Sequence, residues 1–438
     1  MSFLKQAQQG SKFSHAWRAM RHRNFRLFAF GQSISLVGTW MTRVAMAWLV
    51  YRLTKSAWML GAVEFTGQLP SFLVAPLAGV AIDRFDRRNV LICTQALALV
   101  QSFALVALTL THLINIWHIL ALSALQGLIN AFDMPARQSF MVHMVEGRED
   151  LSNAIAINSS MVNLTRLIGP SLAGMLIAIT SEGCCFLIDG ISYIAVIVSL
   201  LMMRVTVLPS EDSRLSAIQQ LREGWQYVSA SMPIRTILLL FALLSLMGWP
   251  FMVLMPIFAA DVLHGGPHTL GFLSGAVGVG ALTCAVSMAM RRSVRGLPPM
   301  LLLGAAVFGC GLMAFSCSTH LWLSLLMMLV TGFGMMQGLT ASNTILQTLV
   351  EERMRGRVMS YYTMAFVGMA PFGSLLSGAL ASSLGVQRTV LISGSACLLG
   401  ALWLSTRLNR MQGLMNPVLQ QIEEFPLYDL RAEEGREG

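Results

Sequence analysis

The stretch Gly79-Val80-Ala81-Ile82-Asp83-Arg84-Phe85-Asp86-Arg87-Arg88 places five charged residues in six positions, directly between two long apolar runs. The runs cover residues 57 to 82 and 89 to 111. A helix needs about 20 apolar residues to cross the roughly 30 Å of hydrocarbon in a bilayer. The stretch is therefore expected to be a tight, solvated turn between two membrane-spanning helices.

Ten further apolar runs extend this pattern along the chain. Only 12% of the residues are charged and the mean hydropathy is +0.65, whereas about a quarter of the residues of soluble domains are charged. The sequence predicts an all-α integral membrane protein with twelve transmembrane helices. The other ten expected spans are 26 to 51, 115 to 137, 153 to 178, 184 to 204, 235 to 260, 270 to 290, 298 to 316, 320 to 345, 358 to 384 and 388 to 407.

The basic residues orient these spans. Of the 30 lysines and arginines, 25 lie in the tails and even-numbered loops, and only Arg52, Lys55 and Arg388 lie in the odd-numbered loops. Basic loops stay on the cytoplasmic side of a membrane, so both termini are expected in the cytoplasm. The net charge of +9 is then explained by the basic cytoplasmic loops, and nucleic acid is not an expected partner.

A polar interruption after the sixth span divides the chain into two halves. We expect a cytoplasmic N-terminal segment, two pseudo-symmetric six-helix bundles, a cytoplasmic linker and a cytoplasmic tail. Their expected bounds are, in the order N-terminal segment, first bundle, linker, second bundle and tail, 1–24, 25–205, 206–233, 234–408 and 409–438. Residues 169–174 align with residues 373–378, and such internal repeats are typical of secondary transporters.

Four motifs resemble one known family. Residues 79–88 resemble the G-x-x-x-D-R-x-G-R-R motif of the major facilitator superfamily, with Asp86 in place of the second glycine. That departure, and residues 133–138, 163–170 and 355–360, resemble the branch that includes the bacterial enterobactin exporter. The resemblance covers nearly the whole chain. It implies the major facilitator fold and location in the inner membrane of a bacterium.

By this resemblance, the turn at 79–88 is a conformational latch on the cytoplasmic side. Arginines there can donate forked hydrogen bonds to carboxylates or to helix carbonyl ends. The alternative is that the arginines only meet phospholipid headgroups. The expected latch residues are Gly79, Asp83, Arg84, Arg87, Arg88 and, as a partner of the arginines, Asp133.

Four of the charged residues inside expected spans stand out, Arg43, Glu64, Arg166 and Asp189, because a charge within a span costs roughly 2.5 to 3.5 kcal/mol on insertion scales. Helical rise places Arg43 and Glu64 at similar depth, and Arg166 and Asp189 at similar depth. The sequence therefore predicts that Arg43 can pair with Glu64 and Arg166 with Asp189. These pairs would either be structural salt bridges or serve substrate binding and proton coupling.

Polar residues also form stripes along spans one, four and ten. In the major facilitator superfamily, which this chain resembles, these spans line the central cavity. Alternatively, these side chains only hydrogen-bond neighbouring helices. The expected coupling or substrate-path residues, beside the four charged ones, are Gln32, Thr39, Gln126, Asn130, Gln337 and Asn343.

Small residues mark close helix contacts. We expect packing roles for Gly169, Pro170 and Gly174, and for Gly373 and Gly378 in the second half. The first three resemble a span-five motif of antiporter branches. However, Ser123 stands where proton-coupled drug antiporters have an arginine.

The resemblance implies a secondary active transporter that exports a small molecule by alternating access, with protons as the expected coupling ion and a siderophore or related metabolite as the first expected cargo. Multidrug efflux, lysophospholipid transport and a non-transporting receptor or scaffold are the alternatives. No enzyme activity, catalytic residue, cofactor or metal site is expected, and no G-x-x-x-x-G-K loop for ATP is present.

Overall fold

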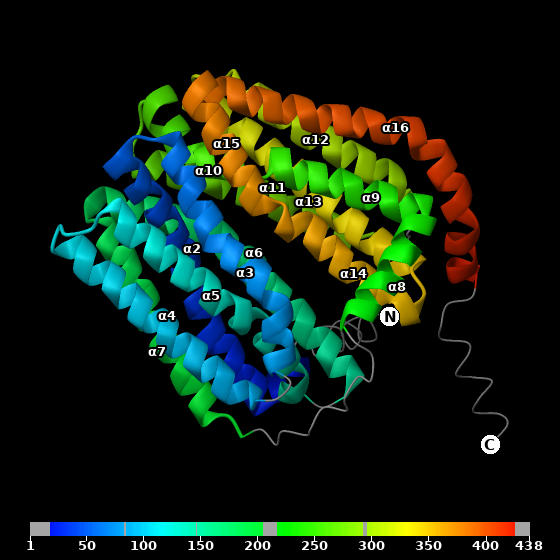
Figure 1. Ribbon diagram of the computed structural model, residues 1–438, viewed down its shortest axis with the longest axis horizontal. Coiled ribbons are helices and arrows are strands. Elements are labelled where there is room, and N and C mark those ends of the chain that lie inside the picture. Colours follow the sequence, from blue (N-terminus) through cyan, green and yellow to red (C-terminus); the bar gives the residue numbers. More distant parts are fainter. Residues whose placement is uncertain (1–17, 83–84, 146, 205–216, 292–295, 425–438) are drawn as a thin grey trace, which may run out of the picture. The chain divides into compact units, whose positions relative to one another are not determined.

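The computed structural model describes residues 18–82, 85–145, 147–204, 217–291 and 296–424, and none of these residues lies in a strand. Long helices make up both halves of the chain (Figure 1). In chain order the helical segments are η1 (Arg18–Arg21), α2 (Arg23–Thr54), α3 (Ala57–Ile82), α4 (Arg87–Leu110), α5 (Ile116–Met141), η2 (Val142–Met144), α6 (Arg148–Ile179), α7 (Glu182–Met202), α8 (Ala217–Ala230), α9 (Met232–Leu243), η3 (Leu244–Gly248), α10 (Phe251–Ile257), η4 (Phe258–Val262), α11 (Pro267–Ala289), α12 (Leu297–Ser316), α13 (Leu321–Leu349), α14 (Glu352–Thr363), η5 (Met364–Gly368), α15 (Ala370–Leu384) and α16 (Val386–Glu424).

The predicted membrane spans coincide with these helices. Within the described residues, 11 helical runs are long and apolar enough to cross a bilayer. The remaining predicted span, 57 to 82, forms α3, whose 26 residues also suffice in length. The prediction of an all-α, multi-pass membrane protein is confirmed.

Contacts divide the chain into two units. The first contains Met1–Asp212 and Met255–Gly275, and the second contains Ser213–Leu254 and Ala276–Gly438. The division after Asp212 lies inside the expected linker. The segment Met255–Gly275 was expected in the second bundle but groups with the first unit.

Two contacts attach that segment to the first unit. Tyr51 of α2 donates a hydrogen bond to Asp261 of η4. A Cβ built on Gly174 of α6 would lie 2.6 Å from the carbonyl oxygen of Pro267 and 2.9 Å from Cα of Gly271. The backbones of α6 and α11 therefore touch, which only glycine permits at this distance.

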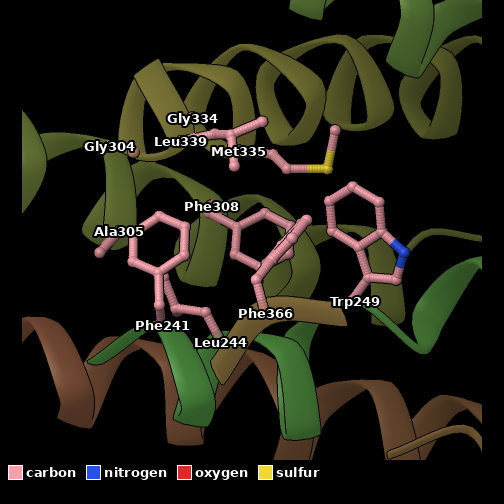
Figure 2. Close-up of a pocket in the computed structure, with 11 residues that line it drawn as sticks. Phe241, Leu244, Trp249, Gly304, Ala305, Phe308, Gly334, Met335, Leu339 and Phe366 are labelled. Carbon is pink, nitrogen blue, oxygen red and sulfur yellow. The ribbon is translucent and has the colours of Figure 1, made fainter. Parts of the chain in front are cut away.

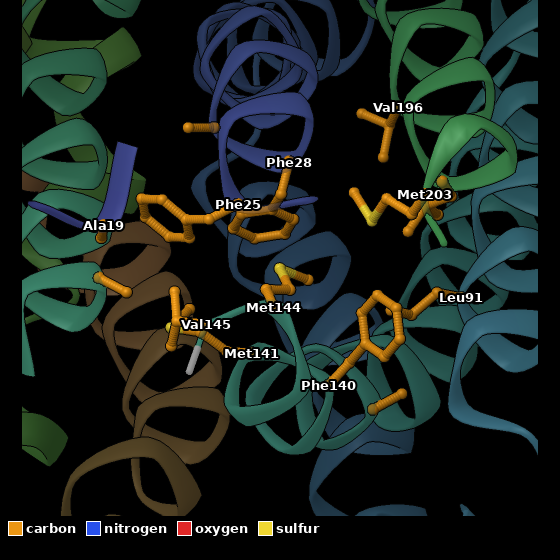
Figure 3. Packing of buried hydrophobic residues seen from close by; sticks show 14 of the residues in the cluster. Ala19, Phe25, Phe28, Leu91, Phe140, Met141, Met144, Val145, Val196 and Met203 are labelled. Carbon is orange, nitrogen blue, oxygen red and sulfur yellow. The ribbon is translucent and has the colours of Figure 1, made fainter. Parts of the chain in front are cut away.

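An apolar cluster fixes one end of the first unit (Figure 3). Phe25 and Phe28 project from the first turns of α2, and their ring centroids lie 6.3 Å apart. They pack with Phe140 and Met144, at the end of α5 and in η2, and with Leu91 of α4. This burial holds the ends of α2, α4 and α5 together around the turn that precedes α4.

Asp86 explains the departure from the family motif. It is the N-cap residue of α4, and its carboxylate accepts hydrogen bonds from the backbone N–H groups of Arg88 (2.8 Å) and Asn89 (3.3 Å). A helix N-terminus leaves such N–H groups without partners inside the helix. An aspartate at this position therefore supplies a side-chain acceptor at the start of α4 that glycine lacks.

In the second unit, α12 packs against α13 and α16. Two π-helical turns, η3 in span seven and η5 in span eleven, lie against each other. Ser245 of η3 donates a hydrogen bond to the carbonyl oxygen of Phe366 in η5. Each π turn frees backbone groups that a regular helix would use, and this bond satisfies one of them.

Helix extends into regions expected to lie outside the bundles. Helix α8 occupies much of the expected linker. Glu223 is paired with Arg357, and the rings of Trp225 and Tyr361 lie tilted at 45° with centroids 6.0 Å apart. Helix α16 continues to Glu424, beyond the expected span end at residue 407. Met411 and Met415 are fully buried there, which explains why the helix continues past the apolar run.

Replacing Asp86 by alanine should lower the free energy of unfolding by about 1 kcal/mol, because two N–H groups of α4 lose their acceptor. The measurement is the thermal midpoint of the purified protein in detergent. Asp86→Asn is the matched control, since asparagine caps almost equally well. Equal midpoints for the alanine and asparagine variants would contradict the capping role.

Candidate functional site

The first unit brings two arginines from different helices onto one indole ring. The Cζ atom of Arg43 lies 5.0 Å from the ring centroid of Trp40, and the Cζ atom of Arg166 lies 5.2 Å from the same centroid. Arg43 and Trp40 are one turn apart on α2, while Arg166 comes from α6. We call Trp40, Arg43 and Arg166 the arginine–tryptophan site.

Gly169 sets the distance between the two helices that form this site. A Cβ built on Gly169 would lie 2.5 Å from Cβ of Trp40 and 3.3 Å from the carbonyl oxygen of Val37. The glycine is one turn beyond Arg166 on α6, so it brings the arginine to the indole. A residue expected only to pack helices thus also positions the site.

Neither predicted charge pair is present among the described residues. Glu64 accepts a hydrogen bond from Gln68, one turn further along α3. Asp189 of α7 faces Gly38 of α2 instead of Arg166. The prediction compared depth alone, and it was wrong because the arginines turn toward Trp40 and the two carboxylates face other neighbours.

Asp189 is buried, and no basic side chain in the described part of the chain pairs with it. Its side chain is enclosed by α2, with Thr39 and Thr42 close to the carboxyl group, and Tyr193 donates a hydrogen bond of 3.4 Å. One carboxyl oxygen has no hydrogen-bond partner. A buried acid of this kind inside a span is costly to keep, so its presence indicates a role other than packing.

The two arginines are incompletely compensated. Their Cζ atoms are at most about 10 Å apart, since both lie close to one centroid. At an effective dielectric of about 20, two like charges at that distance repel by roughly 1.7 kcal/mol or more. Two cation–π contacts return about 0.5 to 1 kcal/mol each, or somewhat more when desolvated. The contacts with the ring therefore offset much of the repulsion between the arginines. The Nε–H of Arg166 is still buried without a hydrogen-bond partner.

The polar stripes divide into buried and accessible parts. Gln32 is buried in α2, whereas Thr39 is exposed beside Trp40. On α5, Gln126 donates a hydrogen bond of 3.1 Å to the exposed Asn130. The stripe on α5 thus has side chains available to a ligand, while Gln32 does not.

The stripe in the second unit behaves similarly. Gln337 of α13 is buried and donates to the carbonyl oxygen of Met300 at 3.3 Å. Asn343, half-buried on the same helix, accepts from the exposed Gln347 at 3.0 Å. Gln337 therefore joins two helices, as the helix-packing alternative expects, and Asn343 stays accessible.

Of the expected latch residues, Asp83 and Arg84 lie outside the described residues, and Gly79 lies in α3. Arg87 contacts Nε2 of His143 at 2.7 Å. Arg88 donates from its two nitrogens, at 2.8 Å each, to the carbonyl oxygens of Leu200 and Leu201 at the end of α7. The fork of Arg88 thus holds a helix carbonyl end.

Asp133 has partners other than the expected arginines of the turn. Its carboxylate accepts from Thr94 (3.0 Å) and Gln95 (2.7 Å) of α4 and forms an ion pair with Arg137, one turn along α5. Asp133 is buried between α4 and α5, so the nearest donors on these two helices satisfy it.

The remaining packing residues lie at close contacts or are buried. Pro170 and Gly174 contact α11, because the carbonyl oxygen of Pro170 abuts Gly271. In the second unit, Gly373 meets the carbonyl oxygen of Leu246 in η3, and Gly378 is buried.

Sequence reasoning missed an aromatic pocket in the second unit. Figure 2 shows Phe241, Trp249, Phe308 and Phe366 around it, with Met335 beside them. The ring of Trp249 meets that of Phe366 edge-on, with centroids 4.9 Å apart. Spacing could not reveal this pocket, because these residues come from four helical segments, and aromatic residues are common in any apolar span.

Comparison with known proteins gives a consistent result. Residues 14–433 match the family described as transmembrane secretion effector. The chain is 26% identical over 371 residues to the staphyloferrin A transporter of Staphylococcus aureus (strain NCTC 8325 / PS 47), covering 84% of this chain and 92% of that protein. It is 25% identical over 374 residues to the multidrug efflux pump Tap of Mycolicibacterium fortuitum, covering 83% and 91%.

A solved structure shows the same fold. A bacterial homolog to the human lysosomal transporter Spinster, in an inward-facing and occupied conformation, superposes with a TM-score of 0.68 at 13% identity, covering 89% of this chain and 97% of that one. The predicted fold is thereby confirmed.

Gly169→Ala should destabilise the protein by about 1 to 3 kcal/mol, because the added methyl group overlaps Trp40 and forces α2 and α6 apart. Gly67→Ala is the matched control, since a Cβ there would make an ordinary contact of 3.7 Å with Ser123. The thermal midpoint in detergent measures both. A Gly169→Ala variant as stable as Gly67→Ala would contradict the close approach.

Proposed function

Because the chain belongs to the transmembrane secretion effector family of the major facilitator superfamily and is a secondary transporter that exports small molecules, we propose that its cargo is a secreted metabolite of the siderophore type. The cargo moves out of a bacterial cell across the inner membrane by alternating access.

One observation carries this proposal. Arg43 and Arg166 lie inside spans, and among the described residues neither has an acidic partner. Charges inside a membrane span are rare and, where kept, serve a substrate or ion path. The similarity to the staphyloferrin A transporter supports a cargo of this type.

We propose the turn at 79–88 as part of the moving machinery. Asp133, Arg137 and the donors on α4 form one buried network, and Arg88 attaches the start of α4 to the end of α7. Gly79, Asp83, Arg84 and Arg87 complete the proposed latch. In this proposal the latch supports one conformer on the cytoplasmic side and releases it during transport.

Glu64 and Asp189 are the proposed proton carriers. Both are carboxyl groups within helices of the first unit, and neither is held in an ion pair. A carboxyl group without a fixed cation can bind and release a proton as its surroundings change. We place both chain termini in the cytoplasm, in accord with the 25 basic residues on that side.

Multidrug efflux is the second candidate, favoured by the aromatic pocket of the second unit. Its lining is apolar and aromatic, which suits a lipophilic group better than a charged one. With a cavity volume of about 20 Å³, the pocket would have to widen to admit a whole compound. The similarity to the multidrug efflux pump Tap supports the same candidate.

A deletion strain grown under iron limitation should release less of at least one metabolite than its parent, and a plasmid copy should restore it. The measurement is mass spectrometry of the culture medium. A second strain carries the chain with Asp133→Asn and Arg137→Gln, and it tests the latch: export should fall because the hydrogen-bond network around Asp133 is disrupted. Identical media from deletion and parent strains would contradict the proposed export.

Glu64→Gln and Asp189→Asn should each uncouple transport from the proton gradient, because the amide cannot take up a proton. The measurement uses vesicles and the metabolite found above, with and without an imposed gradient. Exchange without a gradient should persist in both variants, which shows that they fold. Gradient-driven uptake at the wild-type rate in both would remove these residues as carriers.

A further inference from the structure

We propose that the arginine–tryptophan site binds an oxyanion of the cargo, so that the exported molecule is an organic anion, such as a carboxylate. This inference rests on the proposed function and specifies the class of its substrate.

The site is short of negative charge. Arg43 and Arg166 face one ring of Trp40, and the charged group that acts on Arg166 is the other arginine. The two carboxylates expected to neutralise them, Glu64 and Asp189, bond within α3 and α7 instead. Among the described residues nothing acidic pairs with either guanidinium group, so an anion from outside the chain is the missing component.

The arginines also have unused hydrogen-bond donors. Arg166 is half-buried, and its Nε–H is buried without an acceptor. Arg43 is exposed and makes no hydrogen bond or ion pair among the described residues. A guanidinium group presents its N–H donors as a planar fork that matches a carboxylate or phosphate. One buried and one accessible fork together form a site that an anion can enter from the exposed side.

The two arginines select against a further cation. Trp40 is already in contact with two guanidinium groups, and a third cation would be repelled by both. A cationic drug is therefore a poor ligand here. A molecule that carries carboxylates on a short organic frame can reach both guanidinium groups at once.

A phospholipid phosphate has the same chemistry, so the source of the anion has to be tested. Arg43 lies 11 residues from the end of α2 at Thr54, which is roughly 16 Å along the helix, and Arg166 lies 13 residues from Ile179, roughly 20 Å. These depths are inside the helical spans, away from the headgroups near the helix ends. They favour the cargo over a lipid.

The binding experiment uses the full chain in nanodiscs of phosphatidylcholine, which has no net charge. Citrate serves as the probe anion, and triethyl citrate, its uncharged ester, is the matched control ligand. We expect citrate alone to raise the thermal midpoint. Arg43→Gln and Arg166→Gln should weaken citrate binding at least tenfold, because each removes a charge-assisted fork.

Arg52→Gln is the matched control variant. Arg52 is also an arginine of α2, but it is paired with Glu182 at 2.8 Å, so its loss should leave citrate binding unchanged. Nanodiscs with phosphatidylglycerol provide the lipid comparison. If the anionic lipid raises the midpoint in an Arg43- and Arg166-dependent way while citrate does not, the anion is a lipid phosphate and the cargo proposal is overturned.

The cellular experiment separates this inference from the proposed function. The metabolites missing from the medium of the deletion strain should be retained on an anion-exchange column, and Arg43→Gln or Arg166→Gln should lower their export at least tenfold. If the missing metabolites are neutral or cationic, or if both variants export them normally, the chain is an exporter but the inference is wrong. If no metabolite is missing, the proposed function itself fails.

Discussion

A guanidinium group inside a membrane span has to be compensated, and this constraint organises the first unit. Arg43 and Arg166 use the indole of Trp40 as their shared support. That arrangement requires α2 and α6 to approach until their backbones nearly touch, and Gly169 permits it. The packing of two helices and the electrostatics of the site are therefore one feature. The compensation is partial, which leaves the site able to bind a ligand.

Much of the fold could be predicted from the sequence because the bilayer limits the choices. A chain that crosses hydrocarbon must satisfy its backbone internally, so apolar runs could only be helices. The helices that were not predicted lie outside the apolar runs, where the bilayer does not limit the choices. Helix α8 forms in the polar linker and α16 continues to Glu424, because contacts such as Glu223 with Arg357 and the burial of Met411 add stability that hydropathy does not measure.

The candidate site was less predictable because side-chain direction decides it. Depth along the helices paired Arg43 with Glu64 and Arg166 with Asp189, and neither pair is present among the described residues. Position around the helix axis separates these residues, and it depends on packing between helices. Similarly, Asp133 was predicted to be a latch residue, whereas its partners Thr94 and Gln95 are ordinary polar residues of α4 that no motif marks.

The bonds from Arg88 to Leu200 and Leu201 have a consequence for the end of α7. The last carbonyl groups of a helix normally depend on water or on the residues that follow. Here a side chain from an earlier part of the same unit satisfies them. The end of α7 is thus completed without the segment that comes after it. The pairing of these two carbonyl groups is therefore independent of the sequence that follows residue 204.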